Sequence, residues 1–339
     1  MRRRMLLILN TDSKGYSYGG VCPFMRNMHQ FLNEIFDVSY ITLPESWRKI
    51  PGSVRVKYLI YLFLVRSRLK KGDFILSHGP EGSYVASFSG VPYAHIYHGN
   101  SNPMTISRFR FGKHFAKLWD KMFERIEKTA ALIYTVGPAR NSNHRKLYNP
   151  IEQNVQPLPI QKRFGFIFAG RLESMKNVDR LIKIYSKLPE EIRAENPFYI
   201  AGYGTQEDPL KTLTKQLGLE ERVVFLGKID NSEMLKIDAD KKILLMASST
   251  EGMPTAIAEA FSVGVPIVST AVGDIPNVVV DGMSGRLLPL DYTDEQYIEC
   301  VMDILGSYYK YSVEAYKTAA SFNAKYITEG VVADITKLI

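Results

Sequence analysis

Runs of about five apolar residues alternate with stretches of helical pattern along the chain, and this alternation constrains the fold more than any other feature. In the first half, such runs predict strands at residues 5–9, 38–43, 73–77, 93–97 and 131–136. Short apolar strands separated by helices are typical of a parallel sheet with helices on both faces. A glycine-bearing loop, residues 15–20, follows the first strand and precedes a helix predicted at residues 24–35.

The pattern begins again after residues 148–163, a segment with three prolines and little periodicity that we interpret as a linker. Strands are predicted at 164–170, 198–202, 223–226, 243–246 and 265–269, and helices at 178–188, 209–217, 232–237 and 255–262. We therefore predict an α/β protein of two doubly wound, Rossmann-like domains, residues 1–158 and 159–321. These domains would face each other across a cleft and bind ligands beyond the carboxyl ends of their strands.

Charge is distributed unevenly over the 339 residues. Residues 1–160 contain 23 Lys and Arg against 10 Asp and Glu, a charge of +13, so the remainder carries −5 of the net +8. Two stretches, residues 48–71 and 108–128, mix cations with aromatic and aliphatic residues at roughly helical spacing. Such helices can lie on an anionic membrane surface, where each basic residue contributes ~1 kcal/mol. The alternative is a core helix with solvated basic ends. Nucleic acid is not expected as a partner, because no nucleic-acid motif is found.

The cellular location follows from what the sequence lacks. Cys22 and Cys300 are too few for a disulfide framework, and no apolar run reaches the ~18–20 residues that span a bilayer. The apolar run after Met1-Arg2-Arg3-Arg4 is too short for a signal peptide. We expect a cytoplasmic protein that lies peripherally on the inner face of the cell membrane.

The segment from Ser248 to Ala260 follows a predicted buried strand and opens a helix. Gly252 permits close approach of a ligand, and Thr255 lies where a helix has free N–H groups that can bind a phosphate. Glu259, eight residues after Glu251, could accept hydrogen bonds from the vicinal hydroxyls of a ribose, and Glu251 could point into the cleft. Taken singly, a helix-dipole partner (Glu259) and a solvated loop acid (Glu251) are the simpler interpretations.

A second cluster, Ala169 to Asn177, follows the first strand of the second domain. Arg171, as a planar fork, and Lys176, as a point charge, could converge on the two phosphates of a nucleoside diphosphate. Two independent loop cations are the alternative for either residue alone.

These two clusters belong to a series of motifs that follow one another along the chain. The series is Gly170-Arg171-Leu172 with Lys176, Gly202-Tyr203-Gly204, Val224-Phe225-Leu226-Gly227, Glu251 and Glu259, Gly264-Val265-Pro266-Ile267-Val268, Gly273, and Asp281-Gly282 with Gly285. As a set they resemble the GT-B glycosyltransferases of the family 4 type, which are retaining enzymes that use nucleotide sugars. The resemblance covers residues 164–290 well. The first half is similar more loosely, through Gly19-Gly20, Ser77-His78-Gly79 and His98-Gly99. The chain departs from the family pattern at Asn177, Asp274, Asn277 and Val21-Cys22-Pro23.

The resemblance implies a role for each candidate residue. Arg171 and Lys176 would hold the diphosphate, Glu259 the ribose and Glu251 the donor sugar. The backbone of Gly170, Gly252, Met253, Pro254 and Thr255 would lie against the sugar and the phosphates. Gly19 and Gly20 would let a loop of the first domain approach the phosphates, and His98 would reach toward the donor sugar. Arg171, Lys176, Glu251 and His98 are the candidate catalytic residues, and a final helix, residues 322–339, would cross back onto the first domain.

We therefore expect a retaining glycosyltransferase that moves a hexose-type sugar from a nucleotide diphosphate sugar to a lipid-linked saccharide acceptor in surface polysaccharide biosynthesis. Cations and a helix start can stabilise the departing diphosphate, so neither a metal nor another cofactor is expected. Asp238-Ala239-Asp240 spells the acidic motif of metal-dependent glycosyltransferases, but we interpret it as a solvated turn at the end of a short helix. Alternatives are another GT-B enzyme (a soluble glycosyltransferase with a small acceptor, or a sugar-nucleotide epimerase) and a non-catalytic binder of nucleotides or nucleic acid.

Overall fold

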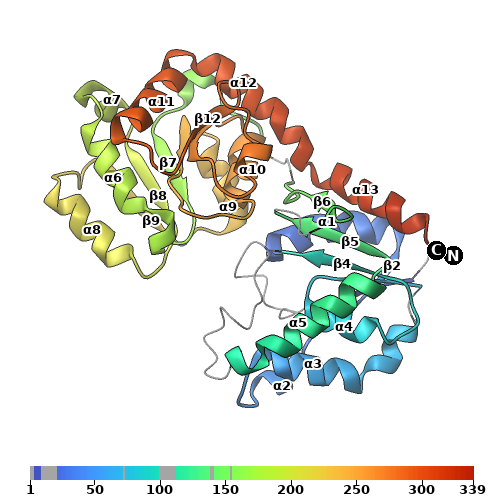
Figure 1. The fold of residues 1–339 in the computed structure, drawn as a ribbon. Coiled ribbons are helices and arrows are strands. Elements are labelled where there is room, and N and C mark those ends of the chain that lie inside the picture. The colour runs from blue at the N-terminus through green and yellow to red at the C-terminus, as the bar shows by residue number, and fades with distance from the viewer. Residues whose placement is uncertain (1–3, 9–20, 72, 99–111, 138–140, 153–154) are drawn as a thin grey trace. The chain divides into compact units, whose positions relative to one another are not determined.

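The computed structural model describes residues 4–8, 21–71, 73–98, 112–137, 141–152 and 155–339. The chain divides into two compact units (Figure 1), one formed by Met1–Pro150 with Ala324–Ile339 and the other by Ile151–Asn323. Each unit contains one parallel six-stranded sheet. Among the described residues, no helix is both long enough and apolar enough to cross a membrane.

The first unit has the strand order β2-β1-β3-β4-β5-β6. Its strands are β1 (Arg4–Ile8), β2 (Asp37–Ile41), β3 (Phe74–Ser77), β4 (Tyr93–Tyr97), β5 (Leu132–Val136) and β6 (Arg145–Leu147). Its helices are α1 (Val21–Ile35), α2 (Glu45–Arg48), α3 (Val54–Leu64), α4 (Pro80–Ala86), α5 (Gly112–Thr129) and α13 (Ala324–Thr336). Phe74 and Leu76 of β3 pack in a core with α1 and α13, whereas Ile75 packs in a second core with α3 and α4. Burial on both faces explains why this strand is a continuous apolar run.

The second unit has the strand order β12-β11-β10-β7-β8-β9. Its strands are β7 (Phe166–Ala169), β8 (Phe198–Ala201), β9 (Val223–Gly227), β10 (Ile243–Leu245), β11 (Ile267–Thr270) and β12 (Gly285–Leu288). Its helices are α6 (Val178–Lys187), α7 (Glu190–Glu195), α8 (Glu207–Gln216), α9 (Asn231–Asp238), α10 (Thr255–Ser262), α11 (Asp294–Gly306) and α12 (Tyr308–Thr318). This is the Rossmann order, and the predicted α/β class with doubly wound parallel sheets is confirmed.

The strand order of the second unit fixes where a ligand can bind. The chain runs from β7 outward through β8 to β9, and then returns to the other side of β7 at β10. The two strands are hydrogen-bonded neighbours, with Ile243 opposite Phe166. Connections on the two sides of this switch point lie on opposite faces of the sheet, so a crevice opens between the loops that follow β7 and β10.

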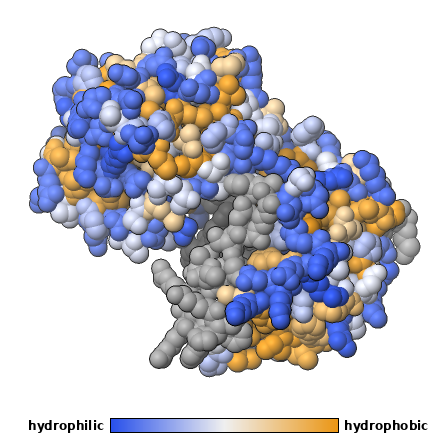
Figure 2. Space-filling view, in the orientation of Figure 1, coloured by the Kyte–Doolittle hydropathy of each residue, from blue (hydrophilic) through white to orange (hydrophobic). Residues whose placement is uncertain are grey.

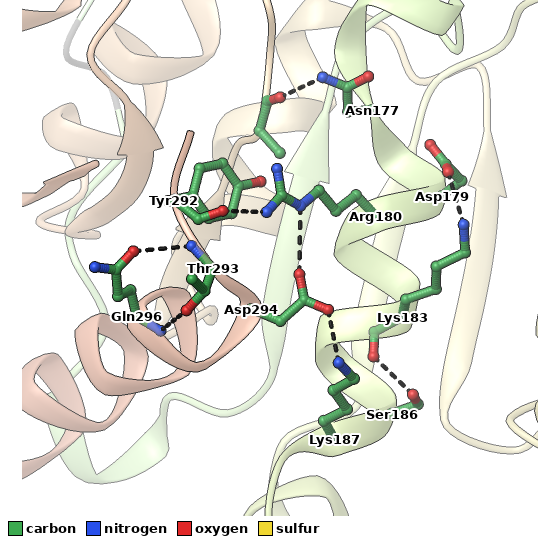
Figure 3. A network of polar contacts seen from close by, with 11 residues as sticks. Asn177, Asp179, Arg180, Lys183, Ser186, Lys187, Tyr292, Thr293, Asp294 and Gln296 are labelled. Carbon is green, nitrogen blue, oxygen red and sulfur yellow. Dashed lines mark hydrogen bonds and ion pairs between the residues drawn. The ribbon is translucent and has the colours of Figure 1, made fainter. Parts of the chain in front are cut away.

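Helix α6 begins directly after the β7 loop and is anchored by the polar network of Figure 3. Arg180 donates to Asp294 at the start of α11 over 3.3 Å, and Lys187 donates to the same carboxylate over 2.8 Å. The hydrogen bond from Lys187 is the main reason that the pKa of Asp294 is lowered. The Arg180 guanidinium also stacks 3.6 Å from the ring centroid of Tyr292. The network holds the end of the β7 loop through the helix that follows it.

Some elements differ from the sequence-based expectation. The edge strands β6 and β12 were not predicted, because cations at Arg145, Lys146 and Arg286 interrupt their apolar pattern. The first unit ends at Pro150 rather than at residue 158. The reason is that Ile151 donates its N–H to the carbonyl of Phe322 over 2.7 Å and so already belongs to the second unit.

Candidate functional site

The loops that follow β7 and β10 are bound to each other. The N–H of Ser249 donates to the carbonyl of Met175 over 2.9 Å, and the side chain of Asn177 donates to the carbonyl of Ala247 over 2.8 Å. Asn177 has a left-handed backbone with φ of 49°, which asparagine tolerates better than most residues. These bonds place the residue before Asn177 beside the segment that leads into α10.

Lys176 and Glu251 form the centre of the site. The Lys176 Nζ lies 2.5 Å from Oε1 of Glu251, and the side chains are only 14% and 8% exposed. The hydroxyl of Ser248 donates to the same carboxylate oxygen over 2.7 Å. A mostly buried cation thus stands at the switch point, held by an acid that also accepts a hydroxyl hydrogen bond.

Helix α10 begins just beyond this pair. Gly252 is exposed and Thr255 is half-buried, whereas Met253 and Glu259 are each only 7% exposed. No acidic residue lies in the first turn of α10, and its N-cap makes no side-chain hydrogen bond. The positive end of the helix dipole is therefore not neutralised by an acid of its own first turn, which favours an anion there.

Glycines bring neighbouring loops close to this region. A Cβ on Gly202 would lie 1.8 Å from the carbonyl oxygen of Gly170, so only glycine fits where the loop after β8 packs on the β7 loop. Likewise, a Cβ on Gly273 would lie 2.1 Å from the carbonyl oxygen of Glu251. These contacts support the backbone on either side of the Lys176–Glu251 pair.

Arg171 lies in the same β7 loop but does not join the pair. Its side chain is exposed and makes no ion pair or hydrogen bond with the part of the chain that the structure describes, whereas its backbone carbonyl accepts from the N–H of Glu173 over 3.0 Å. The structure thus brings Lys176 and Glu251 together, with the start of α10 beside them, and leaves the guanidinium of Arg171 in solvent.

The candidates of the first unit lie at the carboxyl ends of β3 and β4. His98 follows β4 and is half-buried, and its Nε2 lies 3.0 Å from Nδ1 of His78, which follows β3. Phe24 of α1 contacts the His98 ring edge-on, with centroids 4.8 Å apart. Gly19 and Gly20 lie outside the described residues.

The interpretation of the acidic motif as a solvated turn is wrong for Asp238, which is only 1% exposed. The end of α9 packs against α10, and burial raises the pKa of Asp238 well above its usual value, with the charge of Glu259 adding to this shift. Asp240 is partly exposed and pairs with Lys241. Within the described ranges, no three His, Cys, Asp or Glu residues are arranged to hold a metal ion. Ser248 also belongs to the site, and the only indication of this in the sequence is its place three residues before Glu251.

Comparison with known proteins identifies the family. The model of the family Glycosyl transferases group 1 matches residues 150–321, about half of the chain. The chain belongs to the glycosyl transferases of group 1. The family match spans the second unit almost completely, and so contains both the β7 loop and the start of α10.

Individual relatives of this group 1 member resemble it in part. N-acetyl-alpha-D-glucosaminyl L-malate synthase of Bacillus anthracis is 28% identical over 48% of this chain and 45% of the relative. O-antigen chain mannosyltransferase B of Escherichia coli is 32% identical over 37% of this chain and 34% of the relative. The chain therefore spans less than half the length of these curated relatives.

Solved structures match the fold over nearly the whole chain. The lipopolysaccharide outer core galactosyltransferase WaaB, in its apo form, has a TM-score of 0.70 at 16% identity and covers 99% of this chain and 100% of its own. Anabaena HepE in complex with UDP-glucose has a TM-score of 0.71 at 16% identity, covering 98% of this chain and 99% of its own. The GT-B fold expected from the sequence motifs is thereby confirmed.

Proposed function

We propose that the protein is a retaining glycosyltransferase that transfers a hexose-type sugar from a nucleotide diphosphate sugar to a saccharide acceptor. The observation that carries the proposal is the 2.5 Å contact of Lys176 with Glu251 beside the start of α10. This contact supports the proposal, because a cation and helix N–H groups can bind a diphosphate and the neighbouring acid can accept hydrogen bonds from sugar hydroxyls.

The proposed chemistry is stabilisation of a leaving group. As the bond between the anomeric carbon and the diphosphate oxygen breaks, negative charge grows on the diphosphate. Lys176, the first turn of α10 and the solvent-exposed fork of Arg171 would bind that charge more strongly as it develops. The acceptor oxygen bonds to the anomeric carbon on the face that the diphosphate leaves, and its proton passes to the departing phosphate. In this proposal no metal ion or other cofactor takes part.

Arg171→Ala tests the donor site. Loss of one such cation removes about 3 kcal/mol of transition-state stabilisation, so we expect turnover to fall ~100-fold. Binding of UDP, GDP and ADP is measured by thermal shift, in which a ligand at a hundredfold excess over its Kd adds ~2.7 kcal/mol of stability. Arg222→Ala is the control, because Arg222 precedes β9 and so lies at the amino ends of the parallel strands, whereas Arg171 follows β7 at their carboxyl ends.

Product analysis with a labelled nucleotide sugar decides between the functions. A free nucleoside diphosphate together with a lengthened acceptor supports the proposal, and an isomerised sugar would identify an epimerase instead. Unchanged nucleotide affinity in Arg171→Ala, with Arg222→Ala also unchanged, would remove Arg171 from the donor site. Binding of nucleotides without turnover of any nucleotide sugar would leave a non-catalytic binder.

We further propose that the acceptor is lipid-linked and that the first unit lies on the inner face of the cell membrane. The segment of residues 46–72 contains no Asp or Glu. Its exposed cations are Lys49, Arg66, Arg68, Lys70 and Lys71. Exposed apolar side chains lie beside them, with Ile60 50% and Leu64 67% exposed. Figure 2 shows apolar residues gathered over the region of α3, beside the hydrophilic stripe of α5.

Part of this segment is structural rather than available to a membrane. Tyr58 and Leu62 of α3 are fully buried, and Lys57 donates from its ammonium group to the carbonyls of Arg48 and Ile50. Arg55 pairs with the buried carboxylate of Glu81 over 2.9 Å. The membrane proposal therefore depends on the cations that follow α3, together with its exposed apolar face.

Vesicle flotation tests the membrane proposal. We expect binding to vesicles that contain phosphatidylglycerol, and weak binding to phosphatidylcholine alone. Replacing Lys70 and Lys71 by Glu should weaken the binding more than tenfold, because each basic residue contributes ~1 kcal/mol. Lys215→Glu with Lys236→Glu is the control, since it makes the same change of charge at exposed positions of the second unit. Equal loss in both double variants would refute a specific membrane face.

A further inference from the structure

Two histidines of the first unit form a hydrogen-bonded pair at the carboxyl end of its sheet. His78 directly follows β3 and His98 directly follows β4, and these strands are neighbours. The Nδ1 of His78 lies 3.0 Å from Nε2 of His98, and the rings stack with centroids 5.3 Å apart at 24°. Phe24 of α1 contacts both rings edge-on. Each ring is therefore held by the other ring and by Phe24, which restricts its rotation.

The surroundings of the pair keep both rings uncharged. Burial lowers the pKa of His98 to about 4 and that of the neighbouring His29, on α1, also to about 4. Burial likewise lowers the pKa of His78, and the nearby His98, His29 and His95 lower it further. At neutral pH the two rings therefore share one proton in their hydrogen bond, and each carries a single N–H.

The unpartnered nitrogen of His78 decides which ring donates. Nε2 of His78 is buried and has no hydrogen-bond partner among the residues that the structure describes. If His98 donated through Nε2, His78 would have to carry its own proton on that buried, unpartnered Nε2. If His78 donates through Nδ1, the unpartnered Nε2 is only an acceptor, and orphaned acceptors are better tolerated than orphaned N–H groups. His98 then carries its proton on Nδ1.

We propose that His78 is a positioning residue that holds His98 as a neutral hydrogen-bond donor, with its proton on Nδ1, for a hydroxyl group of a sugar. His98 is half-buried, and its Nδ1 has no hydrogen bond to any residue that the structure describes. It lies at the carboxyl end of a parallel strand, where sheets of this kind bind ligands. A neutral N–H suits a hydroxyl oxygen better than a phosphate, which favours cations. The identity of the ligand as a sugar rests on the proposed function.

The protonation state can be measured on the protein without substrate. Imidazole nitrogen-15 chemical shifts in the unliganded chain distinguish the two neutral forms, and His98→Asn identifies the His98 signals by their loss. We expect both His98 and His78 to carry the proton on Nδ1. In His78→Phe, His98 should revert to the Nε2-protonated form that free imidazole favours. His98 protonated on Nε2 in the native protein, or unchanged by His78→Phe, would overturn the inference.

Kinetics then test the positioning role. His78→Phe should lower kcat/KM for the nucleotide sugar by about 10- to 100-fold and leave the Kd of the nucleoside diphosphate unchanged, because the second unit is untouched. His78→Asn places an amide N–H near the position of Nδ1 and should restore most of the activity. Equal losses in both variants would indicate a packing role and refute positioning. A native protein that binds no nucleotide sugar would refute the proposed function separately, and the nitrogen-15 shifts would still decide whether His78 sets the state of His98.

Discussion

At the scale of single residues, Glu251 occupies the position beside Lys176 that a phosphate would take in the proposed donor site. The carboxylate accepts from both Lys176 and Ser248. Glu251→Gln keeps an oxygen for both bonds but removes the competing negative charge. We therefore expect the Kd of a nucleoside diphosphate to fall roughly three- to tenfold, since like charges repel strongly in a partly buried site. Transfer from the complete nucleotide sugar should fall instead, by ~100-fold, because the proposed contact of Glu251 with the donor sugar would be weakened.

Isothermal titration with UDP or GDP and a transfer assay measure the two effects. Glu173→Gln is the control, because Glu173 lies in the same loop and accepts from Thr205 rather than from a cation. Weaker nucleoside diphosphate binding in Glu251→Gln would mean that the acid supports the phosphate site instead of competing for it.

At this scale the sequence indicates which residues gather at the site but not which of them touch. Lys176 and Glu251 could be identified because each follows a predicted strand, and loops at the ends of neighbouring parallel strands meet. Their direct ion pair could not be foreseen, because the strand order β10-β7 is set by the whole sheet. The burial of Asp238 could not be foreseen either, because it depends on α10, which begins 17 residues later in the chain.

At the scale of elements, the loops after β7 and β8 are held together by close backbone contact at Gly202. Alanine there would place Cβ 1.8 Å from the carbonyl oxygen of Gly170 at a φ of +151°, so the backbone must move. We expect Gly202→Ala to lower the free energy of unfolding of the second unit by roughly 2–4 kcal/mol. Nucleotide affinity should fall with it, because Arg171 and Lys176 share the displaced loop.

Gly218→Ala is the matched control, since Gly218 also has a positive φ, +65°, but a Cβ there meets nothing within 4 Å. It should show only the backbone cost of about 1–2 kcal/mol. Both Trp residues, Trp47 and Trp119, belong to the first unit. Urea unfolding of the second unit is therefore seen by circular dichroism and not by Trp fluorescence. Equal destabilisation by the two variants would refute the steric argument.

The central strands of both sheets were predictable because burial on both faces leaves them continuously apolar. The edge strands were not, since an edge strand can carry cations such as Arg145 and Arg286. The helix predicted within residues 108–128 is present as α5. Its exposed side mixes Lys117 and Lys121 with Asp120 and Glu124, so it is less suited to an anionic surface than residues 46–72.

At the scale of the whole molecule, the chain passes between its units twice. The crossings lie side by side in the second unit, where Ile151 and Asn323 form a parallel bridge. Beyond them, Ile327, Val331 and Ile335 of α13 are buried with Phe24, Met28 and Leu32 of α1. The first unit therefore includes the last helix of the sequence, and its stability depends on residues at both ends of the chain.

The stability of the first unit should depend on pH through its neutral histidines. In the folded state the pKa of His29 is about 4, against 6.5 for the free side chain, so the unfolded state binds more protons between these values. Stability is therefore complete above pH 6.5 and falls as the pH decreases toward 4, by up to roughly 3 kcal/mol for His29 alone.

Urea unfolding followed by Trp fluorescence measures the free energy of unfolding of this unit at pH 7.5 and at pH 5. His29→Phe replaces the titrating imidazole, whose buried Nε2 has no partner within the described ranges, by a ring that cannot be protonated, so it should flatten the dependence. An equal decrease in the native protein and in His29→Phe would exclude His29 as the source.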